Sequence, residues 1–188
     1  MNKEKIVSFF FEMASLRRLT RSHRQMIAAV NDNISDHSFR VGIIAMILAG
    51  LEKCDQNKAL KMGLFHDLVE ARTGDANTIN KQYVKLDEEG AREDQLSGLP
   101  IGEEILELLR EYEERKSAES IVAKDADSLD QMVLEQEYFF EDPINRKKWQ
   151  DFMEKKLKTE SAKKLSIEIR NSNPFNWLYQ IMDEKIGH

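Results

Sequence analysis

Apolar residues recur three or four positions apart along most of this chain of 188 residues, the spacing that gathers them on one face of an α-helix. The alternating runs and the Asn-Gly or Asp-Gly turns that mark strands and hairpins are missing from the sequence. It also has no internal repeat and no linker rich in Gly, Ser or Pro. The sequence therefore predicts an all-α fold, a single compact helical bundle over residues 1–188.

Caps and stops place the first helices. We expect the first helix from about Lys3 to Arg18 and, after a loop or short helix through Asn33, a second helix with Ser35 as its N-cap that reaches Gly50. A third helix is expected from near Asp55 to Thr73, where Gly74 suits the left-handed position that ends a helix. The expected buried stripe of the first helix is Ile6, Phe9, Phe10, Met13 and Leu16.

The second half begins with a polar segment, residues 76–99, which predicts a partly irregular connection with a short helix inside it. Two further helices are expected at Gly102–Glu114 and Glu119–Phe140, and Pro143 then precedes a C-terminal helical extension over about 143–188. We interpret the apolar residues of this extension as packing residues. They are Trp149, Phe152, Leu157, Ile167, Phe175, Trp177 and Leu178.

Composition excludes several classes of protein. A single cysteine, Cys54, makes neither an internal disulfide nor a cysteine-based zinc site, and it fits a reducing cytoplasm. The 34 acidic residues outnumber the 28 basic ones, the wrong sign for a protein that follows a nucleic-acid backbone. The longest apolar stretch, Val41 to Leu51, is about half of what a bilayer requires. We therefore expect a cytoplasmic protein without nucleic-acid or membrane partners.

The residues that indicate chemistry are histidines and aspartates. His66 and Asp67 are adjacent within a predicted helix, flanked by Leu64, Leu68 and Val69. A buried carboxylate there is costly unless a cation compensates it. His37 and Asp127 lie on two other apolar helices and offer the same kinds of ligand. Two His and two Asp suit Mn²⁺, Co²⁺, Fe²⁺, Ni²⁺ or Zn²⁺ and leave coordination positions open for water and substrate, which favours catalysis.

Further polar residues follow this pair. Glu70 comes four residues after His66 and three after Asp67, so a helix would place all three on one face. Asp75 follows Gly74 just beyond the expected helix end. A cluster of cations without any acid lies earlier in the chain, comprising Arg17, Arg18, Arg21, His23 and Arg24. In an acidic protein, such a local cluster is where an anionic phosphate ester would find its partners.

The pattern of His37, then His66-Asp67, then Asp127 resembles the signature of the HD-domain metal-dependent phosphohydrolases. The string from His66 to Asp75, with Ser35 to Ser38 and Lys124 to Asp127, narrows the similarity to the YfbR-like 5′-deoxynucleotidase branch. The resemblance covers about residues 5–140. It implies an all-helical HD domain, usually a homodimer, that releases phosphate from deoxynucleoside 5′-monophosphates. The metal that we expect is Mn²⁺ or Co²⁺, with Fe²⁺, Ni²⁺ or Zn²⁺ as alternatives.

The same resemblance implies roles for individual residues. Metal ligands would be His37, His66, Asp67 and Asp127, and the catalytic residues would be Glu70 and Asp75, which orient and deprotonate the attacking water and assist the leaving oxygen. Arg21 matches the phosphate-binding arginine of the branch, and Thr78 and Lys81 match a threonine and a lysine that follow its Gly-Asp. The division of roles between Glu70 and Asp75 stays open.

One position departs from the branch. Ser22 follows Arg21 where bacterial members carry a tryptophan that helps to recognise the sugar, and Trp149 and Trp177 are far away in the sequence. We therefore expect weaker discrimination between dAMP and AMP, unless His23 or Arg24 recognises the sugar instead.

Several neighbours of these residues have more ordinary interpretations. Asp125 and Asp130 compete with Asp127 as ligands, and we interpret them as solvated or capping residues. Arg17, Arg18 and Arg24 read as a surface cluster. Asp36 and Arg40 either orient His37 or are structural.

Two classes of function therefore remain. The first is a metal-dependent phosphomonoesterase whose substrate is a nucleotide or another small phosphate ester. The second is a helical binding or regulatory module that keeps the metal without turnover. The presence of Glu70 and Asp75 favours the first class.

Overall fold

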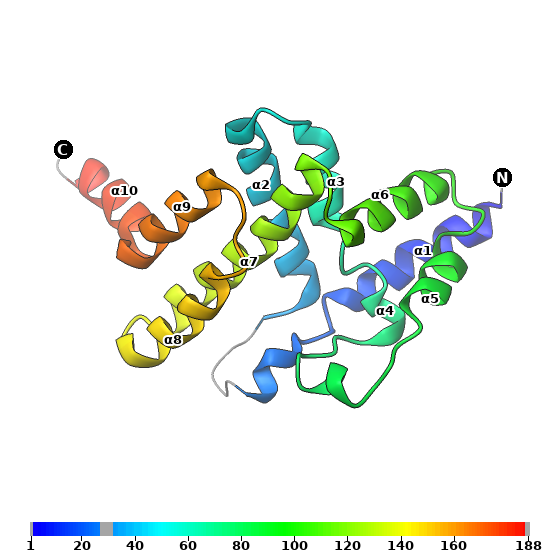
Figure 1. Ribbon diagram of the computed structural model, residues 1–188, viewed down its shortest axis with the longest axis horizontal. Coiled ribbons are helices and arrows are strands. Elements are labelled where there is room, and N and C mark those ends of the chain that lie inside the picture. Colours follow the sequence, from blue (N-terminus) through cyan, green and yellow to red (C-terminus); the bar gives the residue numbers. More distant parts are fainter. Residues whose placement is uncertain (1, 27–31, 187–188) are drawn as a thin grey trace.

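The computed structural model describes residues 2–26 and 32–186. Within these residues the chain is helical apart from turns and an isolated bridge between Thr20 and Asn33, which confirms the all-α prediction. The elements, in chain order (Figure 1), are α1 Lys3–Leu16, η1 Ser22–Gln25, α2 Ile34–Glu52, α3 Gln56–Phe65, α4 Glu70–Thr73, η2 Asn80–Gln82, α5 Glu88–Leu96, α6 Gly102–Glu114, α7 Ala118–Tyr138, α8 Pro143–Glu154, α9 Glu160–Asn171 and α10 Asn176–Ile186.

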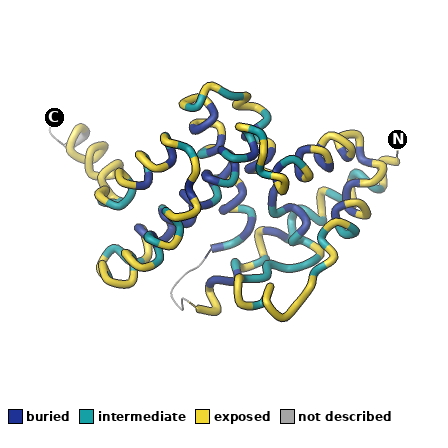
Figure 2. Tube along the Cα trace, viewed as in Figure 1, coloured by how far each residue is buried: buried dark blue, intermediate teal, exposed yellow. Residues whose placement is uncertain are grey.

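The centre of the bundle is formed by α2, α3 and α7, where buried backbone dominates (Figure 2). Glycines let α2 and α3 approach closely: a Cβ added at Gly63 would lie 3.0 Å from both the Gly42 Cα and the Val41 carbonyl oxygen. His37 lies five residues before this crossing and His66 three residues after it. The crossing thus brings the two histidines together at one end of the α2–α3 pair.

The expected third helix is interrupted at the His-Asp pair. Helix α3 ends at Phe65, residues 66–69 form tight turns, and α4 begins at Glu70. The interruption consists of backbone bonds three residues apart, such as Leu68 N to Phe65 O at 3.0 Å and Glu70 N to Asp67 O at 3.0 Å. Gly74 has the expected positive φ of 73°, but its ψ of 161° extends the chain. The prediction of one continuous helix is therefore wrong.

The predicted N-cap of the second helix, α2, is also wrong. Asn33 rather than Ser35 caps α2, because the Asn33 side chain accepts from the Asp36 backbone N–H at 3.0 Å. His37 is the fourth residue of α2 and therefore ends its first turn, as expected. Part of the loop predicted before this cap, residues 27–31, lies outside the described residues.

Helix α2 is apolar and long enough, by length and composition, to cross a bilayer. Its buried face packs instead against α3 and α7 and contains His37, Val41, Ala45 and Leu48. We therefore interpret α2 as the central helix of the bundle.

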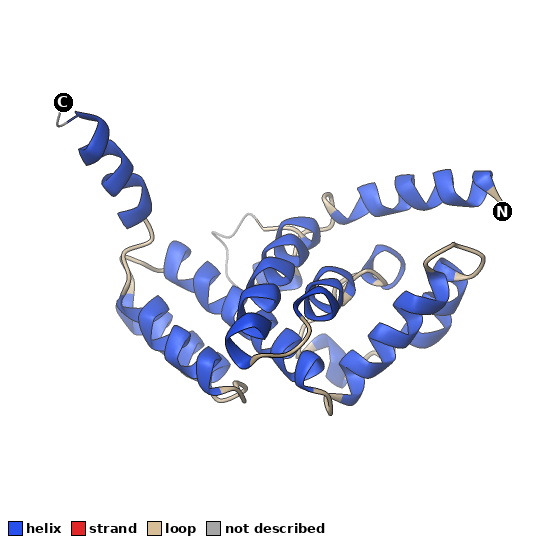
Figure 3. Cartoon of the chain, turned by 90° about the horizontal axis from the view of Figure 1, so that it is seen from above, coloured by secondary structure: helices blue, strands red, loops and turns tan. Residues whose placement is uncertain are grey.

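The interpretation of the C-terminal apolar residues as packing is largely wrong. Leu157 is buried, whereas Phe152, Ile167, Phe175 and Trp177 are about half or more exposed. Helix α10 projects away from the bundle, as the view from above shows (Figure 3). A similar misprediction affects α1, where Phe10 is 64% exposed. An apolar stripe indicates a helical face but does not say what covers that face.

Candidate metal centre

Three parts of the fold bring the four proposed ligands to one point. His37 comes from α2, Asp127 from α7, and His66 with Asp67 from the turn after α3. The His37 and His66 Nε2 atoms are 3.2 Å apart. An Asp67 oxygen lies 3.4 Å from His37 Nε2 and 3.1 Å from His66 Nε2, and an Asp127 oxygen lies 3.4 Å from His37 Nε2. The imidazoles are buried, and both carboxylates keep some exposure.

The other ring nitrogens fix the tautomers of both histidines. His66 Nδ1 lies 2.7 Å from the Gly63 carbonyl oxygen, which only accepts, so Nδ1 carries the proton. His37 Nδ1 likewise donates to the Asp130 carboxylate at 2.6 Å. In neutral rings both Nε2 atoms then present lone pairs toward each other and toward two carboxylates. A cation is the group that satisfies this donor set, and its ligand types fit a divalent transition metal.

Electrostatics keeps the two carboxylates ionised. Burial alone would raise their pKa values, but the neighbouring histidines hold the pKa of Asp67 well below its usual range and also lower the pKa of Asp127. The site therefore presents negative charge over a wide pH range, which favours a cation.

The two neighbours of Asp127 on α7 are both buried and have different roles. Asp125 is neither solvated nor a helix cap: it accepts from the Lys158 and Thr159 backbone N–H groups at 2.7 to 3.0 Å and so holds the segment before α9, whose N-cap is Thr159. Asp130 is neither solvated nor a cap: it bonds His37 Nδ1 and accepts from Arg40 Nε. Asp130 therefore positions a metal ligand, and Arg40 in turn orients Asp130.

Most of the predicted site residues line one cavity of about 440 Å³, namely Arg21, Asp67, Glu70, Asp75, Thr78, Lys81 and Asp127. The buried His37 and His66 are not part of its lining but lie within 3.4 Å of the Asp67 carboxylate that is. His23 also lines this cavity, whereas Arg17, Arg18 and Arg24 are exposed and do not contribute to its lining. That confirms the surface interpretation of these three arginines.

Arg21 lines the cavity with a largely buried guanidinium. Its NH2 group donates to Gln131 Oε1 at 3.4 Å. Nε and NH1 form no hydrogen bond within the described residues, but they lie 3.9 Å from an Asp32 oxygen and 3.8 Å from an Asp130 oxygen. Asp75 holds this segment in place by accepting from the Ser22 backbone N–H at 2.6 Å. The turn that follows the His-Asp pair is thus tied to the arginine that precedes α2.

Glu70 lies in the same cavity and is unusually basic. Burial, together with the negative charges of Asp67 and Asp75, raises the pKa of Glu70 to about 9. One of its carboxylate oxygens, Oε2, is buried without a hydrogen-bond partner in the described part of the chain. In the absence of a cation, such a carboxyl group is largely protonated at neutral pH.

Sequence reasoning missed one wall of the cavity. Helix α8 contributes Trp149, Phe152 and Met153, which follow the helical spacing i, i+3 and i+4, and the turn after α8 adds Lys156. Trp149 is therefore distant from Arg21 in sequence but close in space. The spacing itself was readable, yet an apolar stripe on a C-terminal helix is more often covered by protein.

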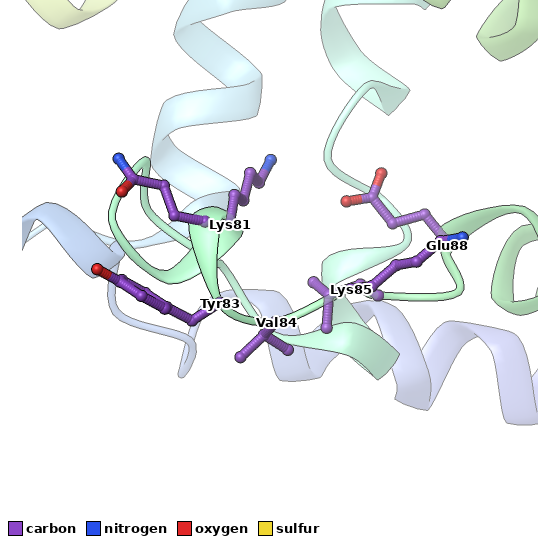
Figure 4. Close-up of a pocket in the computed structure, with 7 residues that line it drawn as sticks. Lys81, Tyr83, Val84, Lys85 and Glu88 are labelled. Atoms are coloured by element: carbon purple, nitrogen blue, oxygen red, sulfur yellow. The ribbon is translucent and has the colours of Figure 1, made fainter.

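A second hollow of about 360 Å³ lies along the loop from Lys81 to Glu88. Figure 4 shows that the Lys81 side chain points away from Tyr83 and Val84, which face the other side of the loop. Lys81 lines both hollows. We assign its amine to the metal-centre cavity, which Asp67, Glu70, Asp75 and Asp127 also line.

Comparisons with known proteins agree with this geometry. A family model described as HD domain matches residues 13–169. The chain is 32% identical over 120 residues to 5′-deoxynucleotidase HDDC2 of Dictyostelium discoideum, covering 57% of this chain and 63% of the relative. For 5′-deoxynucleotidase HDDC2 of Homo sapiens the identity is 30% over 112 residues, covering 57% and 54%. The aligned part is thus less than two thirds of either relative.

Solved structures show the same fold over most of the chain. The PH0347 protein from Pyrococcus horikoshii OT3 superposes with a TM-score of 0.67 at 30% identity and covers 89% of this chain and 98% of that one. The similarity extends well beyond the segment that carries the His and Asp residues.

Proposed function

The chain belongs to the HD domain family, and on that premise we propose that it is a metal-dependent 5′-nucleotidase that releases phosphate from deoxynucleoside or nucleoside 5′-monophosphates. The observation that carries the proposal is the convergence of two imidazoles and two ionised carboxylates at the edge of a cavity that Arg21 also lines. The names of the relatives, 5′-deoxynucleotidases, support the nucleotide class.

The metal ligands in this proposal are His37, His66, Asp67 and Asp127, and the ion is Mn²⁺ or Co²⁺. A divalent ion at this position would polarise a phosphoryl oxygen and acidify a water molecule. Asp130 holds the proton on His37 Nδ1, so that Nε2 stays free for coordination.

The remaining residues act on the substrate. Glu70 accepts the proton of the attacking water in its ionised form, which the charge of a bound divalent ion would favour over the protonated form. Arg21 binds the phosphate through its guanidinium, which within the described residues makes one long hydrogen bond and two long ion pairs. Lys81 and Thr78 line the same cavity and supply further donors. Asp75 fixes the Arg21 segment through Ser22 and assists the leaving oxygen.

A phosphate-release screen tests this function. Protein stripped with a chelator is supplied with Mn²⁺, Co²⁺, Mg²⁺ or Zn²⁺ and offered ribo- and deoxynucleoside 5′-monophosphates. We expect release only with added metal and only from monophosphates. The absence of release from every monophosphate with every metal would refute the proposal, and release in the presence of excess chelator would refute its metal dependence.

We also propose that residues 1–188 act as one domain, cytoplasmic and without nucleic-acid or membrane partners, and that two copies form a homodimer. Support for a dimer comes from α2, whose face opposite the core exposes Phe39, Ile43, Met46 and Ile47. A contiguous apolar stripe of this kind is typical of a protein interface. Sedimentation at micromolar concentration tests it: a monomer would contradict the homodimer.

A further inference from the structure

The α8 wall of the metal-centre cavity has a composition that phosphate hydrolysis does not require. Trp149, Phe152 and Met153 are apolar, and they share the cavity with Arg21, Glu70 and Asp127, which are all charged. The three apolar residues on this face of α8 are spaced like a core stripe, yet Phe152 is 47% exposed. An exposed apolar stripe of this kind is typical of a surface that binds an apolar group of a ligand or partner.

The wall is also rigid and carries a cation. Trp149 packs against the buried Leu134 of α7, which holds its ring in place. Lys156 Nζ lies 4.5 Å from the centre of the Phe152 ring. Burial lowers the pKa of this lysine, and the negative charge of Asp127, which lines the same cavity, opposes that shift. Figure 1 shows α8 running along α7, the helix that supplies Asp127.

A ligand whose phosphate is held by Arg21 and the metal has this wall within the same cavity. The part of a nucleotide opposite its phosphate is a flat aromatic ring with polar edges. Aromatic side chains stack on the faces of such rings, and a lysine donates to the ring nitrogens and carbonyl oxygens at their edges. Apart from Met26 and Ala76, the remaining lining residues are polar or charged and suit phosphate and sugar.

We propose that Trp149, Phe152 and Met153 on α8, with Lys156 in the turn after it, form the nucleobase platform of this cavity, so that the chain acts on phosphate esters that carry an aromatic base rather than on bare sugar phosphates. This inference rests on the proposed nucleotidase function. It also changes the expectation drawn from Ser22: an aromatic ring does reach the cavity, but from α8 and not from the residue after Arg21.

The chain offers a direct probe, since Trp149 and Trp177 are its two tryptophans. Trp177 lies on α10, is 65% exposed and lines a different cavity, so Trp177→Phe leaves Trp149 as the sole reporter. Deoxyadenosine, which has no phosphate to lose, should quench the fluorescence of this variant saturably when excited beyond the absorption of adenine. An equal concentration of 2-deoxyribose should not. Absence of saturable quenching would overturn the platform.

Kinetics provides the second arm. Trp149→Ala should lower the ratio of kcat/KM for dAMP to that for 2-deoxyribose 5-phosphate by about tenfold, the scale of losing one base–aromatic stack. Trp149→Phe should keep most of that ratio, and Trp177→Ala should keep all of it. An unchanged ratio in Trp149→Ala would refute the inference and leave the nucleotidase function standing. If neither ester is hydrolysed by the unmodified protein, the proposed function fails, and the fluorescence titration alone decides whether the platform binds a base.

Discussion

Replacing Asp130 by Asn tests how the fold prepares His37 for a metal. One Asp130 oxygen accepts from His37 Nδ1 at 2.6 Å, and the other accepts from Arg40 Nε. Asparagine keeps one acceptor oxygen and presents an NH₂ group in place of the other. If that group faces His37, the imidazole must move its proton to Nε2 and lose the lone pair that would bind the metal. If it faces Arg40, two donors oppose each other.

The magnitude follows from burial and charge. Loss of a carboxylate that orients a metal-bound histidine typically weakens metal affinity by about 10- to 100-fold, or about 1.4 to 2.8 kcal/mol. Asp130 is fully buried, so water cannot replace the lost acceptor. The hydrogen bond to His37 is also short. We therefore expect Asp130→Asn to fall at the upper end, with close to a 100-fold increase in the Kd for Mn²⁺.

The matched control is Asp125→Asn. Asp125 is as deeply buried on the same helix, but it accepts from the Lys158 and Thr159 backbone N–H groups before α9. Its substitution removes one buried acceptor oxygen, so it should cost about 1 to 3 kcal/mol of unfolding free energy and leave metal affinity unchanged. Isothermal titration of stripped protein with Mn²⁺ measures both variants, and circular dichroism checks that each is folded. A folded Asp130→Asn protein with a Kd within twofold of the unmodified protein would refute the reasoning, as would equal weakening by Asp125→Asn.

Three further substitutions test other parts of the account. Glu70→Gln should keep the metal and lower kcat by at least about 100-fold, because an amide cannot accept the proton of the attacking water; near-normal turnover would remove Glu70 from the mechanism. Arg21→Ala should raise KM and lower kcat together, because its guanidinium holds the phosphate before and during the reaction. A change in KM alone would limit Arg21 to binding the substrate. Glu135 is buried, and burial raises its pKa from 4.5 to about 7, so its ionised form is disfavoured in the fold and stability falls as pH rises from about 4.5 to 7. Glu135→Gln should therefore be more stable than the unmodified protein at pH 8, by up to about 3 kcal/mol, with little difference below pH 5. Thermal unfolding at pH 8 and below pH 5 measures the two differences in stability. Equal differences at the two pH values would contradict the prediction.

The sequence is most informative about the metal ligands. Histidine is scarce in this chain, and His37, His66 and Asp127 each stand among apolar residues that fix which way their helices face. The chemistry of the donor set then requires that they meet. Glu70 follows from its helical spacing after His66 and Asp67, whereas only the match to the phosphate-binding arginine of the resembling branch distinguishes Arg21 from its basic neighbours.

Three features could not be obtained in that way. The role of Asp130 depends on the rotation of α7 about its axis relative to α2, and Asp125, Asp127 and Asp130 look alike in sequence. The break after Phe65 contains no Gly or Pro to mark it, because it is made of backbone bonds three residues apart. Trp149 and Phe152 form a regular apolar stripe, and its period is the same whether protein or a ligand covers it.

The central claim is that His37, His66, Asp67 and Asp127 together hold a divalent metal ion. Elemental analysis of Asp67→Ala after exhaustive dialysis against metal-free buffer tests it most directly, with the unmodified protein loaded and dialysed in parallel. The account predicts a stoichiometric divalent ion in the unmodified protein and its loss from the variant, since two lone pairs and one carboxylate would remain without the oxygen that lies within 3.4 Å of both imidazoles. Tight metal retained in folded Asp67→Ala would contradict the assignment of the site.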